Sequence, residues 1–145
     1  MGTLVYITIE QALDTHKKTI QHSGGGTLGG LELGKLEGVL QNIQNDDWYP
    51  TFPEKLTHLF FCTCRFHCFS DGNKRLAITL SAQFLLLNGY MAIARDFFKI
   101  TENISYHVAA RRISKELLLR IMIAIMDGTY ESDESLKLEI LNAIA

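Results

Sequence analysis

Apolar residues recur every three or four positions along most of the chain, which is the spacing of one face of an α-helix. Leu56, Leu59, Phe60, Thr63 and Cys64 follow this spacing and are predicted to face the core. A brief extended segment is predicted at residues 90–93. Together with helix start and stop signals, the pattern predicts helices over residues 9–22, 35–44, 53–66, 73–88, 101–112, 114–127 and 132–145.

Local signals support the ends of these helices. Thr8, followed three residues later by Gln11, is typical of a capping box at a helix start. Pro53 suits the first turn of a helix, and Asn88 with Gly89 suits a helix end. Helices joined by short connections predict an all-α fold, a single-domain helical bundle.

The domain is expected to span residues 1–145, with its core at about 5–125 and an additional C-terminal helix at about 132–145. The helix at 73–88 is apolar nearly all round, so we expect it to be central. Residues 23–34 hold six glycines and are predicted to form a flexible flap. This segment is not predicted to be a phosphate-binding loop, because no Gly-Lys-Ser/Thr follows it.

Composition limits the classes of partner. The 145 residues carry a formal net charge of −2, which does not favour nucleic acid as a partner. No apolar run reaches the ~18 residues that a membrane span needs, and the N-terminus lacks the basic start of a signal peptide. We therefore expect a cytoplasmic protein without a membrane partner. Four basic residues cluster and are predicted to form a solvated helix face: Arg111, Arg112, Lys115 and Arg120.

Cys62, Cys64 and Cys68 lie close together, and an odd count within one predicted helix argues against disulfides. A transition-metal site formed by these thiols and His67 is one hypothesis. However, Cys62 and Cys64 lie about 200° apart around a helix axis, so the ligands would not converge without a second element. Buried free thiols are the simpler interpretation.

The polar stretch from His67 to Arg75 lies between the two most apolar helices. The first backbone N–H groups of the helix that begins near Asn73 have no partner within the helix, so this end can bind a phosphate. Gly72 lets the backbone approach an anion closely. Lys74 and Arg75 add positive charge, and an arginine can bind a phosphate with two hydrogen bonds.

Two further residues complete the groups that phosphoryl or nucleotidyl transfer requires. Asp71 supplies a hard oxygen ligand for Mg²⁺, and His67 can accept a proton near neutral pH. However, a turn followed by a helix cap would also explain Asp-Gly-Asn, and a lone histidine is more often structural. The residues alone leave the catalytic and the structural interpretations open.

At these positions the sequence resembles the Fic/Doc family, whose loop motif reads His-x-Phe-x-Asp/Glu-Gly/Ala-Asn-Gly/Lys-Arg. Every defined position of that motif is matched from His67 to Arg75. The likeness to the Doc branch extends to Trp48-Tyr49-Pro50 and to the helix end from Phe84 to Tyr90. The resemblance implies the Fic fold, in which a short β-hairpin can form a flap. Residues from about 31 to 44 would be the flap against which the target docks.

The resemblance also implies a role for each motif residue. His67 would take the proton of the target hydroxyl, and Asp71 would hold Mg²⁺. The phosphates of ATP, or of another nucleoside triphosphate, would be bound by Gly72, Asn73, Lys74 and Arg75.

Residues at three positions differ between the nucleotide-transferring branch of the family and the Doc branch. The nucleotide-transferring branch typically has Gly in place of Lys74 and an additional Arg in place of Ile78. At both positions this chain is more similar to Doc, a branch associated with phosphate transfer. Gly72 follows the nucleotide-transferring branch instead, since Doc often has Ala there.

The resemblance therefore implies a Doc-like kinase, a transferase that moves a phosphate from ATP to a Ser/Thr hydroxyl of a target protein, with a translation factor as one candidate target. It would be the toxin of a toxin–antitoxin pair. Ile140 follows Ser135 and Glu139 where the family's inhibitory motif has Gly or Asn. Two ways of restraining the enzyme are therefore open: the C-terminal helix as a built-in inhibitor, or a separate antitoxin protein. Two alternatives remain open: adenylyl transfer (AMPylation) to a protein hydroxyl, and a catalytically silent partner-binding module.

Overall fold

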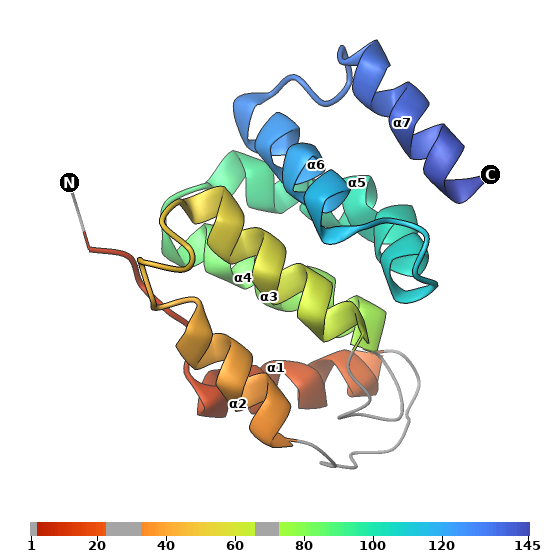
Figure 1. Cartoon of the computed structure of the whole chain (residues 1–145). Helices are drawn as coiled ribbons and strands as arrows, with labels where there is room; N and C mark the ends of the chain where they lie inside the picture. Colours follow the sequence, from red (N-terminus) through yellow and green to blue (C-terminus); the bar gives the residue numbers. More distant parts are fainter. Residues whose placement is uncertain (1–2, 23–32, 66–72) are drawn as a thin grey trace.

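The computed structural model describes residues 3–22, 33–65 and 73–145. Seven α-helices and no strand occur in these ranges, so the all-α prediction is confirmed for them. None of these helices is long and apolar enough to cross a membrane. The helix bounds are α1 Ile9–His22, α2 Leu33–Asn42, α3 Phe52–Arg65, α4 Asn73–Leu87, α5 Met91–Ala109, α6 Lys115–Asp127 and α7 Glu134–Ile144 (Figure 1).

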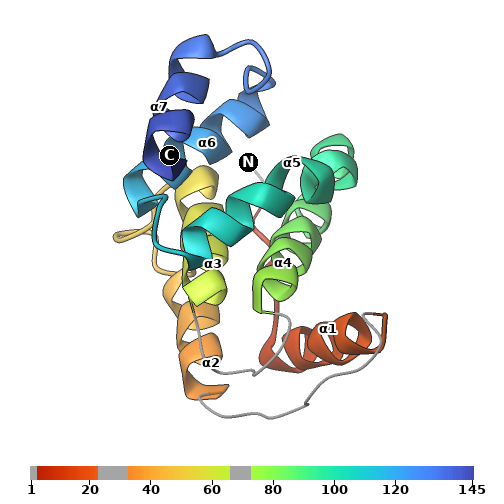
Figure 2. The same cartoon turned by 90° about the vertical axis from the view of Figure 1, so that its right-hand side faces the viewer.

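Helices α3 and α4 run antiparallel through the centre of the molecule (Figures 1 and 2). Helix α5 packs against both of them, and α6 packs against α3. Helix α1 packs on α4, and α2 packs on α3. Helix α7 lies at the edge of the molecule, where it contacts α6. The central place predicted for the helix at 73–88 is therefore confirmed, with α4 beginning at residue 73 and ending at residue 87.

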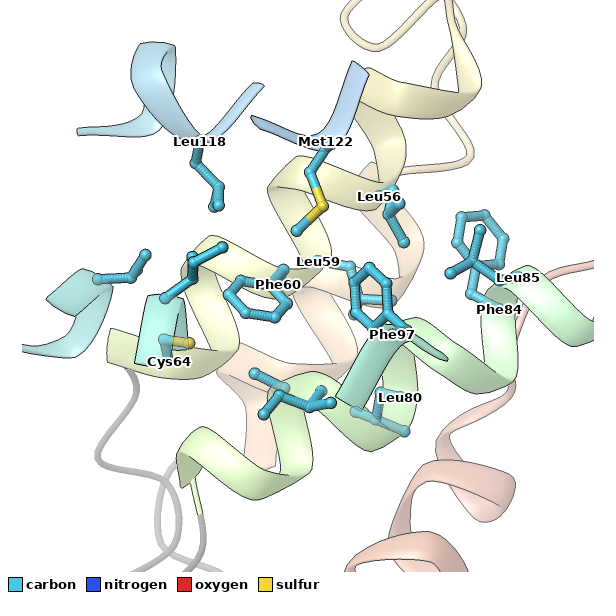
Figure 3. Packing of buried hydrophobic residues seen from close by; sticks show 14 of the residues in the cluster. Leu56, Leu59, Phe60, Cys64, Leu80, Phe84, Leu85, Phe97, Leu118 and Met122 are labelled. Carbon is cyan, nitrogen blue, oxygen red and sulfur yellow. The ribbon is translucent and has the colours of Figure 1, made fainter. Parts of the chain in front are cut away.

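The core lies where α3, α4, α5 and α6 meet (Figure 3). The ring of Phe60 in α3 meets the ring of Phe97 in α5 edge-on, with the ring centres 6.0 Å apart. Met122 of α6 and Leu80 of α4 are fully buried in the same cluster. All five residues that the apolar spacing placed in the core are buried: Leu56, Leu59, Phe60, Thr63 and Cys64.

The predicted helix ends follow the local signals. The backbone N–H of Gln11 donates to the hydroxyl of Thr8 at 3.1 Å, and the N–H of Thr8 donates to the side chain of Gln11 at 2.9 Å, which completes the capping box. The hydroxyl of Ser114 accepts from the N–H of Leu117 at the start of α6. Gly128 ends α6 in the left-handed conformation, with φ of 77°.

Only part of the segment predicted to form the flap lies within the described residues. Residues 33–42, which the family resemblance placed in a possible hairpin, form helix α2, close to the helix predicted at 35–44. The remaining glycine-rich residues, 23–32, lie outside the described part of the chain, and so does the flexibility predicted for them.

The predictions for residues 90–93 and for a helix start at Thr101 are wrong. Residues 91–93 and Thr101 belong to one helix, α5, which begins at Met91 after its N-cap residue Tyr90. Thr101 is fully buried, and its hydroxyl donates to the carbonyl of Phe97 one turn earlier at 2.7 Å. A threonine that bonds back in this way is compatible with a helix interior, so it does not mark a helix start here.

The turn between α5 and α6 places a non-glycine residue in a backbone conformation that favours glycine. Arg111 has φ of 64°, whereas Gly89 and Gly128 occupy the same left-handed region after α4 and α6. The N–H of Arg111 donates to the carbonyl of Val108 at 3.1 Å, which closes the end of α5. A side chain in this conformation costs about 1 kcal/mol or more.

We therefore expect Arg111→Gly to raise the free energy of unfolding by about 1 kcal/mol, because glycine adopts this conformation without a Cβ clash. Urea denaturation measures the change. Gly128→Ala is the matched control of opposite sign: it introduces a Cβ at φ of 77° into open space, so its cost is conformational. Lower stability of Arg111→Gly would mean that the arginine side chain stabilises the turn by more than its backbone strain costs.

Candidate active site

The end of α3 and the start of α4 lie at the same edge of the molecule because the two helices are antiparallel. Arg65 is the last residue of α3, Asn73 is the first residue of α4, and residues 66–72 connect them. Three predicted site residues fall in this connection, outside the described residues: His67, Asp71 and Gly72.

The other three predicted site residues, Asn73, Lys74 and Arg75, form the first turn of α4. The side chains of Lys74 and Arg75 are exposed, and no acidic residue lies in this turn. Leu76 and Ala77 follow directly and are fully buried, so the turn is anchored on the core. Helix amides and two cations are thus held together, which is an arrangement suited to binding a phosphate.

Arg75 also lies at one end of a groove of about 440 Å³ between α1, α4 and α5. Its guanidinium carbon is 5.6 Å from the centre of the Phe98 ring, within cation–π distance. Lys18 of α1 brings a second cation to the groove, paired with Asp14 at 3.0 Å. The remaining lining residues are Thr15, Thr79, Ala82, Gln83 and Leu86.

Arg65 ties the end of α3 to the turn between α5 and α6. Its Nε donates to the carbonyl of Val108 at 3.1 Å, and a terminal nitrogen donates to the carbonyl of Ile113 at 3.4 Å. Its guanidinium carbon lies 4.1 Å from the centre of the Phe61 ring. Burial, and then the charge of Arg111, lowers the pKa of Arg65. No local pattern in the sequence indicates this anchor, since an arginine in the last turn of a helix is commonly solvated.

The two described cysteines are free thiols in different surroundings. Cys64 is buried in the core, and Cys62 is half-buried with its Sγ 3.6 Å from Nδ1 of His58. Burial raises the pKa of both thiols. Cys68 and His67, which complete the metal-site hypothesis, lie outside the described residues. The described ranges hold no cluster of three or more potential metal ligands.

A second polar cluster, which the sequence did not indicate, links α3 to α6. Nζ of Lys115 donates to Nδ1 of His58 at 2.8 Å, so Nδ1 must be the unprotonated nitrogen of the ring. The proton of the neutral imidazole is then on Nε2, which lies 3.4 Å from the hydroxyl oxygen of Tyr49. Burial, and then the charge of Lys115, lowers the pKa of His58 to about 4.

The C-terminal helix makes one ion pair with α6, between Glu139 and Arg120. Glu139 is the carboxylate that the spacing of the family's inhibitory motif singled out. In this structure it is held by α6.

Residues 6–85 match the Fic/DOC family. The matched stretch is more than half of the 145 residues and runs from the segment before α1 into the last turns of α4, so it includes the whole motif. It is shorter than the range of about 5–125 over which the resemblance was expected. No curated protein matches the chain.

Stability is expected to fall as the pH is lowered from about 6.5 to about 4. The unfolded chain protonates His58 near its ordinary pKa of 6.5, whereas the folded protein does so only near 4, so the unfolded state binds the extra proton in this window. The loss amounts to roughly 2–3 kcal/mol. His58→Gln, whose amide oxygen can still accept from Lys115, should remove this component when urea denaturation is followed across the window. An unchanged pH dependence in that variant would contradict the low pKa of His58.

Proposed function

This chain belongs to the Fic/Doc family, whose members transfer part of a nucleotide to proteins, and we propose that within the family it is a Doc-like protein kinase. The target hydroxyl oxygen, from Ser or Thr, forms a bond to the γ-phosphorus of ATP. The bond from that phosphorus to the bridging oxygen breaks, and ADP leaves. His67 accepts the hydroxyl proton.

The first turn of α4 is the observation that carries this proposal. Its amides, with Lys74 and Arg75, would bind the phosphates, and Gly72 and Asn73 would complete the contact. The turn contains no acidic residue, and we propose Asp71 in the preceding connection as the metal ligand. Mg²⁺ bound there would neutralise charge on the phosphates.

The environment of Ile78 supports phosphate transfer over nucleotide transfer. Ile78 is 2% exposed and belongs to the core cluster. The position at which the nucleotide-transferring branch typically has an additional Arg therefore offers no cation to the phosphates one turn after Arg75. Without that contact, the distal phosphates are not held for attack at the α-phosphorus.

We also propose a toxin role in the cytoplasm, with an antitoxin protein as the partner that restrains the enzyme. The groove beside Arg75 suits such a partner, because its floor is partly apolar, through Leu86 and Phe98, and Lys18 adds a second cation. A helix or extended segment with carboxylates near Lys18 and Arg75 would cover the groove and approach the start of α4.

Labelled ATP separates the proposed reaction from its alternatives. Purified protein incubated with cell extract is expected to transfer label from γ-labelled ATP and not from α-labelled ATP. Transfer from the α position would mean adenylyl transfer, and no transfer by folded protein would favour the catalytically silent module. His67→Ala should abolish both the labelling and any inhibition of cell growth. His58→Gln is the matched histidine control outside the motif and should retain both.

Arg75→Gln is expected to raise the KM for ATP by roughly tenfold to a hundredfold, because a charged hydrogen bond contributes about 1.5–3 kcal/mol. Initial rates at varied ATP concentration measure this. Arg95→Gln is the control, since Arg95 pairs with the neighbouring Asp96 on α5. An unchanged KM in Arg75→Gln would remove Arg75 from the phosphate site.

A further inference from the structure

The turn between α5 and α6 carries two exposed cations, Arg111 and Arg112. No Asp or Glu oxygen of the described residues lies within 4.0 Å of either guanidinium group. Two other exposed arginines do have carboxylate partners: Arg95 pairs with Asp96, and Arg120 pairs with Glu139. The positive charge of this turn is therefore available to an outside group.

The contacts that these arginines make do not neutralise their positive charge. Arg112 lies 3.3 Å from Nδ1 of His107, and its guanidinium carbon is 5.8 Å from the centre of the Tyr106 ring. Neither partner carries a carboxylate. Arg111 is held at φ of 64°, a conformation that glycine adopts at lower cost. Backbone strain of this kind is often found where the side chain has a function.

The other two basic residues of the sequence cluster do not join this surface. Lys115 points to the His58 ring, and Arg120 pairs with Glu139. The solvated helix face predicted for all four residues is therefore divided, and the unpaired charge is confined to Arg111 and Arg112.

This turn lies beside the candidate active site (Figures 1 and 2). Arg65 donates to carbonyls on both sides of it, at Val108 and Ile113, and Arg65 directly precedes the connection to α4. After burial, the charge of Arg111 is the next cause of the lowered pKa of Arg65, and the charge of Lys74 partly offsets the effect of burial on the pKa of Cys64, the neighbour of Arg65. The end of α3 therefore lies near both cationic elements.

We propose that Arg111 and Arg112 dock an acidic segment of the protein substrate close to the hydroxyl that is modified. The proposal rests on the proposed function, because it specifies the substrate of that site. Two neighbouring guanidinium groups suit two carboxylates. A nucleic acid is a poorer match, since its binding usually engages a longer row of cations and the whole chain has a net charge of −2.

The test uses the double variant Arg111→Gly/Arg112→Gln, which removes both charges and relieves the backbone strain at residue 111. Label transfer from γ-labelled ATP to the target band is measured at several concentrations of nuclease-treated extract. At low extract concentration the rate should fall roughly threefold to tenfold, and it should approach the wild-type rate at high concentration. The KM for ATP should not change. Arg111→Lys/Arg112→Lys should retain most of the rate, and Arg95→Gln should equal wild type.

A second measurement does not depend on catalysis. Fluorescence anisotropy of labelled poly-L-glutamate, and of labelled oligo-dT, reports binding to the wild-type protein and to the double variant at low salt. We expect poly-L-glutamate to bind the wild type more tightly than the variant, by a factor similar to that expected for the labelling rate. The difference in affinity should shrink as salt is added.

Equal binding of poly-L-glutamate by both proteins would overturn the proposal, as would equal labelling rates at every extract concentration. Tighter binding of oligo-dT than of poly-L-glutamate at this turn, or loss of labelling on nuclease treatment, would replace the acidic protein segment with a nucleic acid. If the wild type transfers no label at all, the proposed function fails, and the anisotropy result alone decides whether the turn binds carboxylates.

Discussion

Burial of the apolar faces of α3 and α4 against α5 and α6 fixes two helix ends at one edge of the molecule. A fully buried Leu or Phe side chain contributes about 1.5–3 kcal/mol, and Phe60, Leu80 and Phe97 are all fully buried at this junction. The last residue of α3 and the first residue of α4 are therefore held in place by the core. Arg65 then connects that edge to the α5–α6 turn through two backbone carbonyls. The candidate phosphate site and the proposed docking turn are neighbours as a consequence of this packing.

The positive charge at this edge arises from the arrangement of the cations and not from the composition of the chain, whose net charge is −2. Some cations are neutralised by carboxylates, as Lys55 is by Asp46 at 2.7 Å. Others donate to uncharged acceptors, as Lys115 does to His58. In the described part of the chain, no ion pair involves the exposed cations of the first turn of α4 or of the α5–α6 turn. A local field that favours anions can therefore exist on a protein that is acidic overall.

Features set by neighbouring residues were predictable from the sequence, and features set by distant contacts were not. The caps at Thr8 and Ser114 could be predicted because each side chain bonds to a backbone group three residues away. The prediction at Thr101 is wrong because a threonine followed by a glutamate is typical of a helix start, whereas here the threonine is buried and bonds back to the carbonyl of Phe97 within α5. The bond from Lys115 to His58 joins residues 57 positions apart, so no local pattern indicates it. For the site, the motif directed attention to the start of α4, which the structure places on the core, while His67, Asp71 and Gly72 lie outside the described residues.

Binding of the triphosphate by the first turn of α4 can be measured without a target protein. Backbone amide chemical shifts of ¹⁵N-labelled protein, titrated with ATP and Mg²⁺, locate the bound phosphates residue by residue. We expect the largest shifts at the amides of Asn73, Lys74 and Arg75, and we expect inorganic triphosphate to reproduce them. Saturation with ATP that leaves these amides unchanged, while others shift, would contradict a phosphate site at the start of α4.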